Sequence, residues 1–264
     1  MTTDPRRPLD ATSLTNDLAP PWRRLEVVEV TGSTNADLIA RAQSGQDIAG
    51  AVLIAEHQTA GKGRLTRTWY TAPCAQVAMS VGVATGGVPA ARWGWLPLAA
   101  GLAVIDAIAA VTGLEAGLKW PNDVLVGDRK LAGILAEVGR RQAIVVGIGL
   151  NVTLTPAQAG DPAATSLLEL GVDHPDRTLL TSSLLHHLGH RVTQWRSADP
   201  RLPTDYRNHS LTVGNQVRAI LPGNQEITGD AQGVDEQGRL RIDTNDGRTV
   251  ALSAGDVVHL RPTP

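Results

Sequence analysis

The segment Glu56–Trp69 (EHQTAGKGRLTRTW) constrains the fold most, because a buried strand ends there and a flexible basic loop begins. Before it, Ala51–Ala55 is an unbroken apolar run of the length expected for a buried strand. The loop itself holds closely spaced glycines and cations, which are Gly61, Lys62, Gly63, Arg64 and Arg67. Glycines let the backbone take positive φ and approach a ligand closely. Clustered cations repel each other, so we expect an anion such as a phosphate or a carboxylate to order the loop.

Two interpretations of this loop remain open from the residues alone, a solvated basic loop and an anion-binding loop. A P-loop is excluded, since that motif has a glycine separated by four residues from its Gly-Lys pair and a Ser or Thr after the pair. Here Glu56 stands at the first glycine position and Gly63 follows Lys62. Any phosphate would therefore be bound by another scheme.

The composition indicates a globular protein of a reducing, aqueous compartment. The 264-residue chain is 42% hydrophobic and 19% charged, which allows a substantial core. A formal net charge of −2 gives no global attraction to nucleic acid or an anionic membrane. The single cysteine, Cys74, excludes an internal disulfide. The chain has no apolar run of about 18 residues and no apolar signal-peptide core. We therefore expect a cytoplasmic protein that binds neither DNA nor a membrane.

Polar motifs follow several of the expected elements. The strand Leu25–Val30 leads to Ser33-Thr34-Asn35 and an amphipathic helix that ends near Ala42. Ser33 or Thr34 would cap that helix, and the same groups could also face a polar ligand. A strand is expected at Gln76–Val83, and a central buried helix at Trp95–Val111.

A second unusual stretch is Gly117–Asp123 (GLKWPND), in which Pro121 stiffens the backbone beside Lys119. It reads either as an ordinary turn or as a rigid holder for aimed side chains. A hairpin over residues 124–138 follows, and within it Lys130 points either to solvent or into a pocket. The next strand, Ala143–Leu150, has glycines at 147 and 149 that indicate close approach by a ligand or a neighbouring chain.

The residue pattern changes near the C-terminal end, from a long helix to short strands separated by turns. A helix is expected from about Thr178 to Arg196, and its three histidines lack Asp, Glu or Cys partners at ligand spacing, so we interpret them as a polar surface. After it, short strands alternate with turns over roughly 50 residues, which predicts a small β-barrel. We expect a large domain over residues 1–210, with residues 1–8 disordered, and the barrel over residues 211–264.

The motifs together resemble those of the bacterial biotin protein ligases. They occur in this order: Ser33-Thr34-Asn35, AGKGR at 60–64 with Arg67 and Trp69, Lys119–Asp123, Arg129–Leu135 (RKLAGIL) and Gly147–Asn151 (GIGLN). The resemblance covers roughly residues 25–261. It implies an α+β fold, with a mixed-sheet catalytic domain akin to class II aminoacyl-tRNA synthetases and an SH3-like β-barrel. Some members add a DNA-binding winged helix, for which we expect no room here, so the chain resembles the monofunctional type.

The resemblance also implies an activity. Biotin and ATP would form biotinyl-5′-AMP and pyrophosphate with Mg²⁺, and biotin would pass to a lysine of the biotin carboxyl carrier domain of acyl-CoA or pyruvate carboxylases. The rivals are a lipoate or octanoate ligase or transferase of the same superfamily, a non-enzymatic repressor or adaptor, and an aminoacyl-tRNA synthetase paralogue. The Lys-Trp-Pro-Asn-Asp run argues against the first and the near-neutral charge against DNA or tRNA binding. The oligomeric state stays open between a monomer and a weak homodimer.

Residue roles carry over by motif position. The resemblance assigns the biotin ureido and ring region to Ser33, Thr34, Asn35 and Gln58, closure over biotin to Gly61, Lys62, Gly63 and Arg64, and the carboxylate side to Lys130 and Gly133. It assigns the nucleotide to Arg64, Arg67, Trp69, Lys119, Asn122, Asp123 and Asn151. The expected catalytic residues are Lys119, Arg64, Arg67 and Asp123. Lys119 would steady charge at the α-phosphate, and Asp123 would orient either the incoming lysine or a metal.

The loop departs from the family pattern at two positions. Lys62 stands where arginine is usual, and lysine lacks the bidentate fork of arginine. We therefore expect a looser grip on biotinyl-5′-AMP. Equal dissociation rates of that intermediate from the wild type and Lys62→Arg would refute this. Thr66 stands where glycine is usual, which would reduce flexibility. We also expect the loop to be disordered without ligand.

Overall fold

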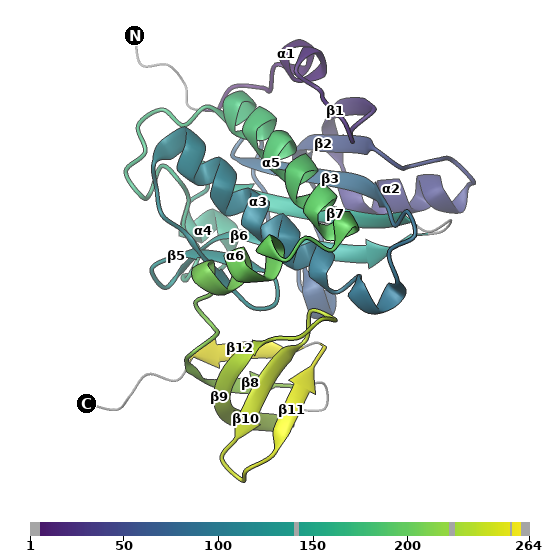
Figure 1. Cartoon of the computed structure of the whole chain (residues 1–264). Helices are drawn as coiled ribbons and strands as arrows, with labels where there is room; N and C mark the ends of the chain where they lie inside the picture. The colour runs from purple at the N-terminus through teal and green to yellow at the C-terminus, as the bar shows by residue number, and fades with distance from the viewer. Residues whose placement is uncertain (1–5, 140–142, 222–224, 254, 260–264) are drawn as a thin grey trace.

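The computed structural model describes residues 6–139, 143–221, 225–253 and 255–259. These residues form two β-sheets with helices packed on the larger one (Figure 1). In chain order the elements are α1 (Ala11–Asn16), β1 (Arg24–Thr31), α2 (Thr34–Gln43), β2 (Ala51–Gln58), the 3₁₀ helix η1 (Arg64–Thr66), β3 (Gln76–Ala84), the 3₁₀ helix η2 (Ala90–Arg92), α3 (Trp95–Thr112), β4 (Gly117–Lys119), β5 (Asp123–Val126), β6 (Arg129–Val138), β7 (Ala143–Asn151), α4 (Pro156–Ala159), α5 (Arg177–Ser197), α6 (Arg201–His209), β8 (Gln216–Ile220), β9 (Glu226–Val234), β10 (Leu240–Thr244), β11 (Thr249–Leu252) and β12 (Asp256–His259).

The larger sheet has seven strands in the order β1-β2-β3-β7-β6-β5-β4. Strands β1 and β2 run parallel, and the other neighbours are antiparallel, so the sheet is mixed. Strand β3 is buried along nearly its whole length, as its continuous apolar pattern predicts. The strands and the hairpin expected from the sequence are confirmed, and so is the α+β fold class.

Helices cover both faces of this sheet. Helices α3 and α5 pack side by side on one face, and α2 covers the other (Figure 1). Leu38 of α2 belongs to one buried apolar cluster with Leu53 and Val145. Helix α3 ends at Gly113, whose φ of 71° closes the helix in the left-handed conformation. Over the described residues, the stretch Ala90–Thr112 is long and apolar enough to cross a membrane by composition. However, 67% of its apolar window is buried inside the protein, which is typical of a core helix.

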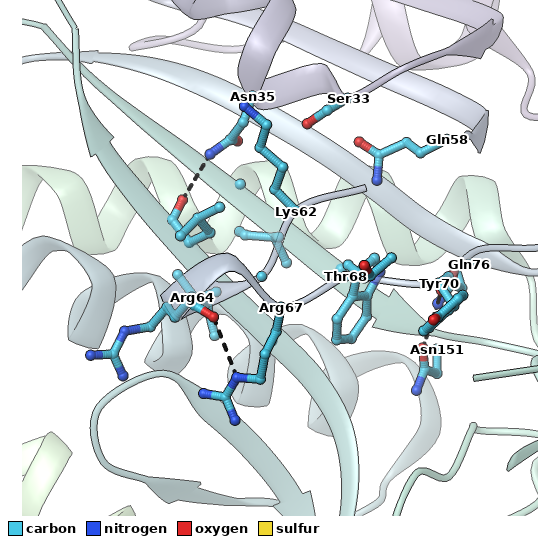
Figure 2. A pocket seen from close by; sticks show the side chains of 18 of the residues that line it. Ser33, Asn35, Gln58, Lys62, Arg64, Arg67, Thr68, Tyr70, Gln76 and Asn151 are labelled. Atoms are coloured by element: carbon cyan, nitrogen blue, oxygen red, sulfur yellow. Dashed lines mark hydrogen bonds between the residues drawn. The ribbon is translucent and has the colours of Figure 1, made fainter. Parts of the chain in front are cut away.

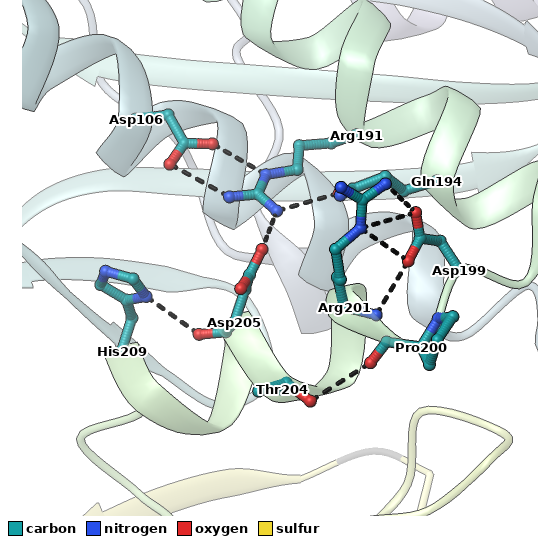
Figure 3. Close-up of polar contacts among 9 residues, drawn as sticks. All are labelled: Asp106, Arg191, Gln194, Asp199, Pro200, Arg201, Thr204, Asp205 and His209. Carbon is teal, nitrogen blue, oxygen red and sulfur yellow. Dashed lines mark hydrogen bonds and ion pairs between the residues drawn. The ribbon is translucent and has the colours of Figure 1, made fainter.

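Arg191 on α5 fastens three helices together (Figure 3). Its Nε donates to Asp106 on α3 at 2.8 Å, and its Nη1 pairs with Asp205 on α6 at 2.5 Å. Nη1 also donates to Gln194 on α5 itself. The Arg191 side chain is only 9% exposed, so its guanidinium is poorly solvated, while Asp106 and Asp205 are 23% and 34% exposed.

We expect Arg191→Met to lower the free energy of unfolding by about 3 kcal/mol, because it leaves two carboxylates without their shared cation. Urea denaturation measures the change. Arg201→Met is the matched control, since Arg201 pairs with Asp199 while its own side chain is 71% exposed. A solvent-exposed pair of this kind contributes little to stability, because water screens it. Equal losses in the two variants would contradict the prediction.

The smaller sheet has five antiparallel strands in the order β11-β10-β9-β8-β12. Two buried tryptophans of the larger part donate their indole N–H groups to its backbone: Trp95 to Asp235 O at 2.8 Å and Trp120 to Gly238 O at 3.2 Å. The sheet is thereby fixed beside Trp120, which directly follows Lys119 at the end of β4. The division into residues 1–210 and 211–264 stays a prediction.

Another expectation concerns the N-terminal residues 1–8. Residues 1–5 of the expected disordered segment 1–8 lie outside the described residues. Arg6 donates hydrogen bonds to Thr153 and Gln158, and Arg177 donates to the Arg7 carbonyl.

Among the described residues, no group of three or more His, Cys, Asp or Glu side chains is placed to hold a metal ion.

Candidate functional site

A cavity of about 170 Å³ opens between the start of α2, the basic loop and the strands β6 and β7 (Figure 2). Most residues selected from the sequence line it. They are Ser33, Thr34, Asn35, Gln58, Lys62, Gly63, Arg64, Arg67, Trp69, Asn122, Lys130, Gly133 and Asn151. Gly61 lines a wider groove next to it, shared with the loop, α3 and the smaller sheet. Lys119 and Asp123 are not among the described residues that line the cavity, although both line a smaller pocket together with Asn122.

Trp69 lies across the strands inside this cavity, and two glycines make room for its ring. A Cβ on Gly149 would lie 2.5 Å from Trp69 Cζ2, and one on Gly133 would lie 3.0 Å from Cζ3. A Cβ on Gly147 would lie 2.9 Å from Asn35 Cγ. Close approach by a ligand or a neighbouring chain was expected at residues 147 and 149, and among the described residues the side chains of Asn35 and Trp69 approach there. Within the described part of the chain, the buried indole N–H of Trp69 has no hydrogen-bond partner.

Lys130 projects into the cavity, which answers the question that the sequence left open. Its backbone is held by hydrogen bonds to Ala163 and Thr165, which pin the start of β6 to the loop before α5. Its Nζ lies 2.7 Å from Asp123 Oδ1 and 5.6 Å from the ring centroid of Trp69. A cation held between a carboxylate and an aromatic face is fixed in position, which suits the binding of an anion.

The opposite wall is polar and comes from the start of α2. Ser33 is the N-cap of α2, with its Oγ 3.5 Å from Ala36 N, so the expected capping role is confirmed. Thr34 N donates to Gln58 Oε1 at 2.9 Å, and Asn35 Nδ2 donates to Glu137 Oε2 at 2.8 Å. These buried groups, with Ser33, Thr34 and Asn35 each under 5% exposed, form what we call the polar end of the cavity.

The basic loop is folded over the cavity. Arg64 donates to Asn122 Oδ1 at 3.1 Å and to the carbonyl of Gly255 at 3.4 Å, so it bridges the two sheets. Leu65 and Thr66 have φ angles of 52° and 63°, the left-handed region in which side chains are disfavoured. The glycine usual at position 66 would meet no such cost. The disorder expected of the ligand-free loop stays a prediction.

Thr66→Gly is expected to favour this folded loop by about 1 kcal/mol, since glycine adopts positive φ without a steric cost. That amount corresponds to an approximately fivefold slower release of biotinyl-5′-AMP, the intermediate that the resemblance implies. A chase experiment with labelled intermediate measures the rate. Thr68→Gly is the matched comparison, because Thr68 is not among the residues with positive φ and glycine there should only loosen the loop. Faster release from Thr66→Gly would contradict the prediction.

Lys119 occupies a different place from the other expected cations. It ends β4, opposite Asp123 on β5, and lies near His259 of the smaller sheet. Burial, and secondly the charge of Lys119, hold the pKa of His259 below its ordinary value. The expected role of Lys119 at an α-phosphate stays a prediction.

Several lining residues were missed from the sequence, notably Gln76, Ser80 and Asp161. Gln76 Nε2 donates to Asn151 Oδ1 at 2.6 Å, and Asn151 Nδ2 donates to the carbonyl of Thr165, so Gln76 orients Asn151. A signal was present, because Gln76 and Ser80 are polar residues inside an otherwise apolar strand.

Comparisons with known proteins agree with this geometry. Residues 27–151 match the Biotin/lipoate A/B protein ligase family, and residues 212–260 match the Biotin protein ligase C terminal domain. A biotin--[acetyl-CoA-carboxylase] ligase of Mycobacterium tuberculosis is 57% identical over 97% of each chain. The bifunctional ligase/repressor BirA of Bacillus subtilis is 31% identical over 78% of this chain and 65% of its own length.

The structure resembles that of a biotin protein ligase from Aquifex aeolicus solved in complex with biotin and ATP. The TM-score is 0.77 at 26% identity, and the match covers 91% of this chain and 100% of the other. The likeness to the Mycobacterium tuberculosis relative includes both sheets, since it spans nearly the whole chain. This chain therefore belongs to the biotin protein ligase family.

Proposed function

We propose that this protein activates biotin with ATP to biotinyl-5′-AMP and then transfers biotin to a lysine of a carrier protein. The observation that carries the proposal is a single cavity with two chemically different ends. Its polar end offers neutral hydroxyl and amide groups, and Arg64, Arg67 and Lys130 line the cavity elsewhere, while Lys62 extends from the loop toward Asn35 (Figure 2). A substrate with a neutral polar head and a carboxylate tail fits that division, and the similarity to the Mycobacterium tuberculosis ligase supports it.

The chemistry needs binding and charge compensation more than a nucleophile from the protein. In the first step a carboxylate oxygen of biotin attacks the α-phosphorus of ATP, and pyrophosphate leaves. In the second step the lysine amine attacks the acyl carbon of the mixed anhydride, AMP leaves, and the amine loses a proton. The carboxylate and the triphosphate repel each other, so the cations around the cavity would hold them in line. Lys130 is the group we place beside the carboxylate.

Mg²⁺ is expected to accompany ATP. This ion usually keeps several waters and binds one or two carboxylates together with substrate phosphates. The carboxylate of Asp161 lines the cavity, and that of Asp123 adjoins it. Such a donor set fits a metal that comes with its nucleotide, and Asp161 is the residue we expect to hold it. Bound there, the ion would offset phosphate charge.

The proposal also concerns the protein that accepts biotin. The name of the relative from Mycobacterium tuberculosis designates acetyl-CoA-carboxylase as the protein that it modifies. We propose a lysine on the biotin carrier domain of such a carboxylase as the acceptor here. The oligomeric state stays open between a monomer and a weak homodimer.

Exchange of labelled pyrophosphate into ATP tests the first step directly. We expect exchange that depends on biotin and is absent with lipoate or octanoate. Exchange with lipoate would make the assignments of Ser33, Gln58 and Lys130 wrong. No exchange with any of these acids would indicate a binding protein that keeps the fold without the activity.

A further inference from the structure

A buried hydroxyl lies beneath the polar end of the cavity. Ser80 stands in the middle of β3, in register with Leu53 and Gly147 of the neighbouring strands, and its side chain is 0% exposed. A buried hydroxyl is costly unless it is hydrogen-bonded. Ser80 Oγ lies 2.6 Å from Thr34 Oγ1 and 2.6 Å from Asn35 Oδ1, so it links two residues of α2.

Which group donates in each of these hydrogen bonds follows from the other contacts of the Asn35 amide. Asn35 Nδ2 donates to Glu137 Oε2 at 2.8 Å and to the carbonyl of Leu135 at 3.2 Å. Both partners are acceptors, so the Asn35 oxygen must be the atom that faces Ser80. An amide oxygen only accepts, and the Ser80 hydroxyl therefore donates to Asn35. Its one proton is then used, so Ser80 can only accept from Thr34.

Thr34 is thereby left with a defined role. Its hydroxyl proton is committed to Ser80, and its oxygen keeps a lone pair for another donor. Thr34 Oγ1 also lies 3.1 Å from Gln58 Oε1, which accepts the backbone N–H of Thr34 at 2.9 Å and has a second lone pair, but the hydroxyl has one proton to donate. The shorter contact with Ser80 takes the proton. Toward the cavity, Thr34 Oγ1 is an acceptor, and the Nε2 amide of Gln58 is a donor.

We propose that Ser80 is a specificity-determining positioning residue, which holds Thr34 Oγ1 as the acceptor for an N–H group of the biotin ureido ring. The inference rests on the proposed function. A cyclic urea presents N–H donors beside a carbonyl acceptor, which complements an acceptor on Thr34 and a donor on Gln58. An alkyl acid such as octanoate has no N–H, and it would leave the lone pair of Thr34 buried and unpaired. Sites built to pair a polar substrate group reject analogues that lack it.

Replacing Ser80 with alanine tests the role with little change in volume. Without Ser80, the Thr34 hydroxyl can turn and donate elsewhere, so the acceptor is no longer enforced. We expect the Kd for biotin, measured by titration calorimetry, to rise about 10- to 100-fold. Desthiobiotin, which retains the ureido ring, should lose affinity by the same factor. The KM for ATP and the kcat of pyrophosphate exchange at saturating biotin should not change.

Two comparisons separate this role from a structural one. In a Thr34→Val background, Ser80→Ala should have no further effect on biotin affinity, because Ser80 acts through Thr34. Thr181→Val is the matched control: it removes a buried hydroxyl that donates only to a carbonyl of its own helix, Arg177 O, and should leave biotin affinity unchanged. Additive effects in the double variant, an equal rise in the KM for ATP, or unchanged biotin affinity in Ser80→Ala would overturn the proposal. A wild type without biotin-dependent exchange would instead overturn the proposed function itself.

Discussion

Lys130→Met is expected to lower kcat for biotinyl-5′-AMP formation by about 10²–10³-fold, the usual effect of removing one preorganised charge or donor from a reacting centre. The ammonium of Lys130 is held by Asp123 at 2.7 Å and by the face of Trp69, so it is positioned before any anion arrives. A methionine keeps the length of the side chain and removes the charge. Single-turnover formation of the intermediate measures the loss.

Three companion variants make this result interpretable. Arg129→Met removes a neighbouring exposed cation at the start of the same strand and should leave the rate unchanged. Lys130→Arg keeps the charge and should retain part of the rate. Lys119→Met, at a lysine outside the cavity wall, should have a smaller effect than Lys130→Met. A larger loss in Lys119→Met than in Lys130→Met would contradict this prediction and would show that the charge of Lys119 contributes more to the rate than the charge that we place beside the carboxylate. Thermal unfolding would confirm that each variant is folded.

The elements of the fold follow from local sequence signals. The apolar run of β3, the left-handed Gly113 after α3 and the Ser33 cap of α2 each combine a pattern with a simple steric or hydrogen-bonding rule. Strand order is different, because it depends on pairings between segments far apart in the chain. The resemblance to a known family supplied the mixed sheet, and residue periodicity would not have done so.

The site was predictable where its residues are chemically conspicuous. Cations and glycines in a polar loop stand out, and the structure brings nearly all of them to one cavity. The residues that position the other lining side chains carry a weaker signal. Ser80 and Gln76 lie in an apolar strand, and Glu137 is an ordinary charge near the end of a hairpin. Their importance comes from partners across the sheet, which a linear pattern does not show.

Close approach to the backbone at Gly147 and Gly149 was predicted correctly, but the groups that approach differ from those that were expected. Close approach was expected there, and the sequence suggested a ligand or another chain as the approaching group. The structure instead places Asn35 against Gly147 and Trp69 against Gly149. A side chain from elsewhere in the fold uses the same space that a ligand would use. The glycines are therefore part of the site, because they allow its walls to form.

Gly149→Ala is accordingly expected to raise the KM for ATP at least about 10-fold and to lower stability by about 1–3 kcal/mol. The new Cβ would lie 2.5 Å from Trp69 Cζ2, a separation that side chains do not reach, so the indole must move. Trp69 is the aromatic surface that we assign to the nucleotide, and its displacement should weaken ATP more than biotin. Titration of each ligand separately, with thermal unfolding, measures both effects.

The steric cause can be isolated from a general effect of alanine in a strand. A Cβ on Gly233 of β9 would meet no heavy atom within 4 Å, so Gly233→Ala is the matched control and should change neither quantity. Trp69→Phe removes part of the ring that the new methyl group would meet. In a Trp69→Phe background, Gly149→Ala should therefore cost less stability than in the wild type. An equal cost in both backgrounds would show that Gly149 is needed for its backbone and that Trp69 is not the cause.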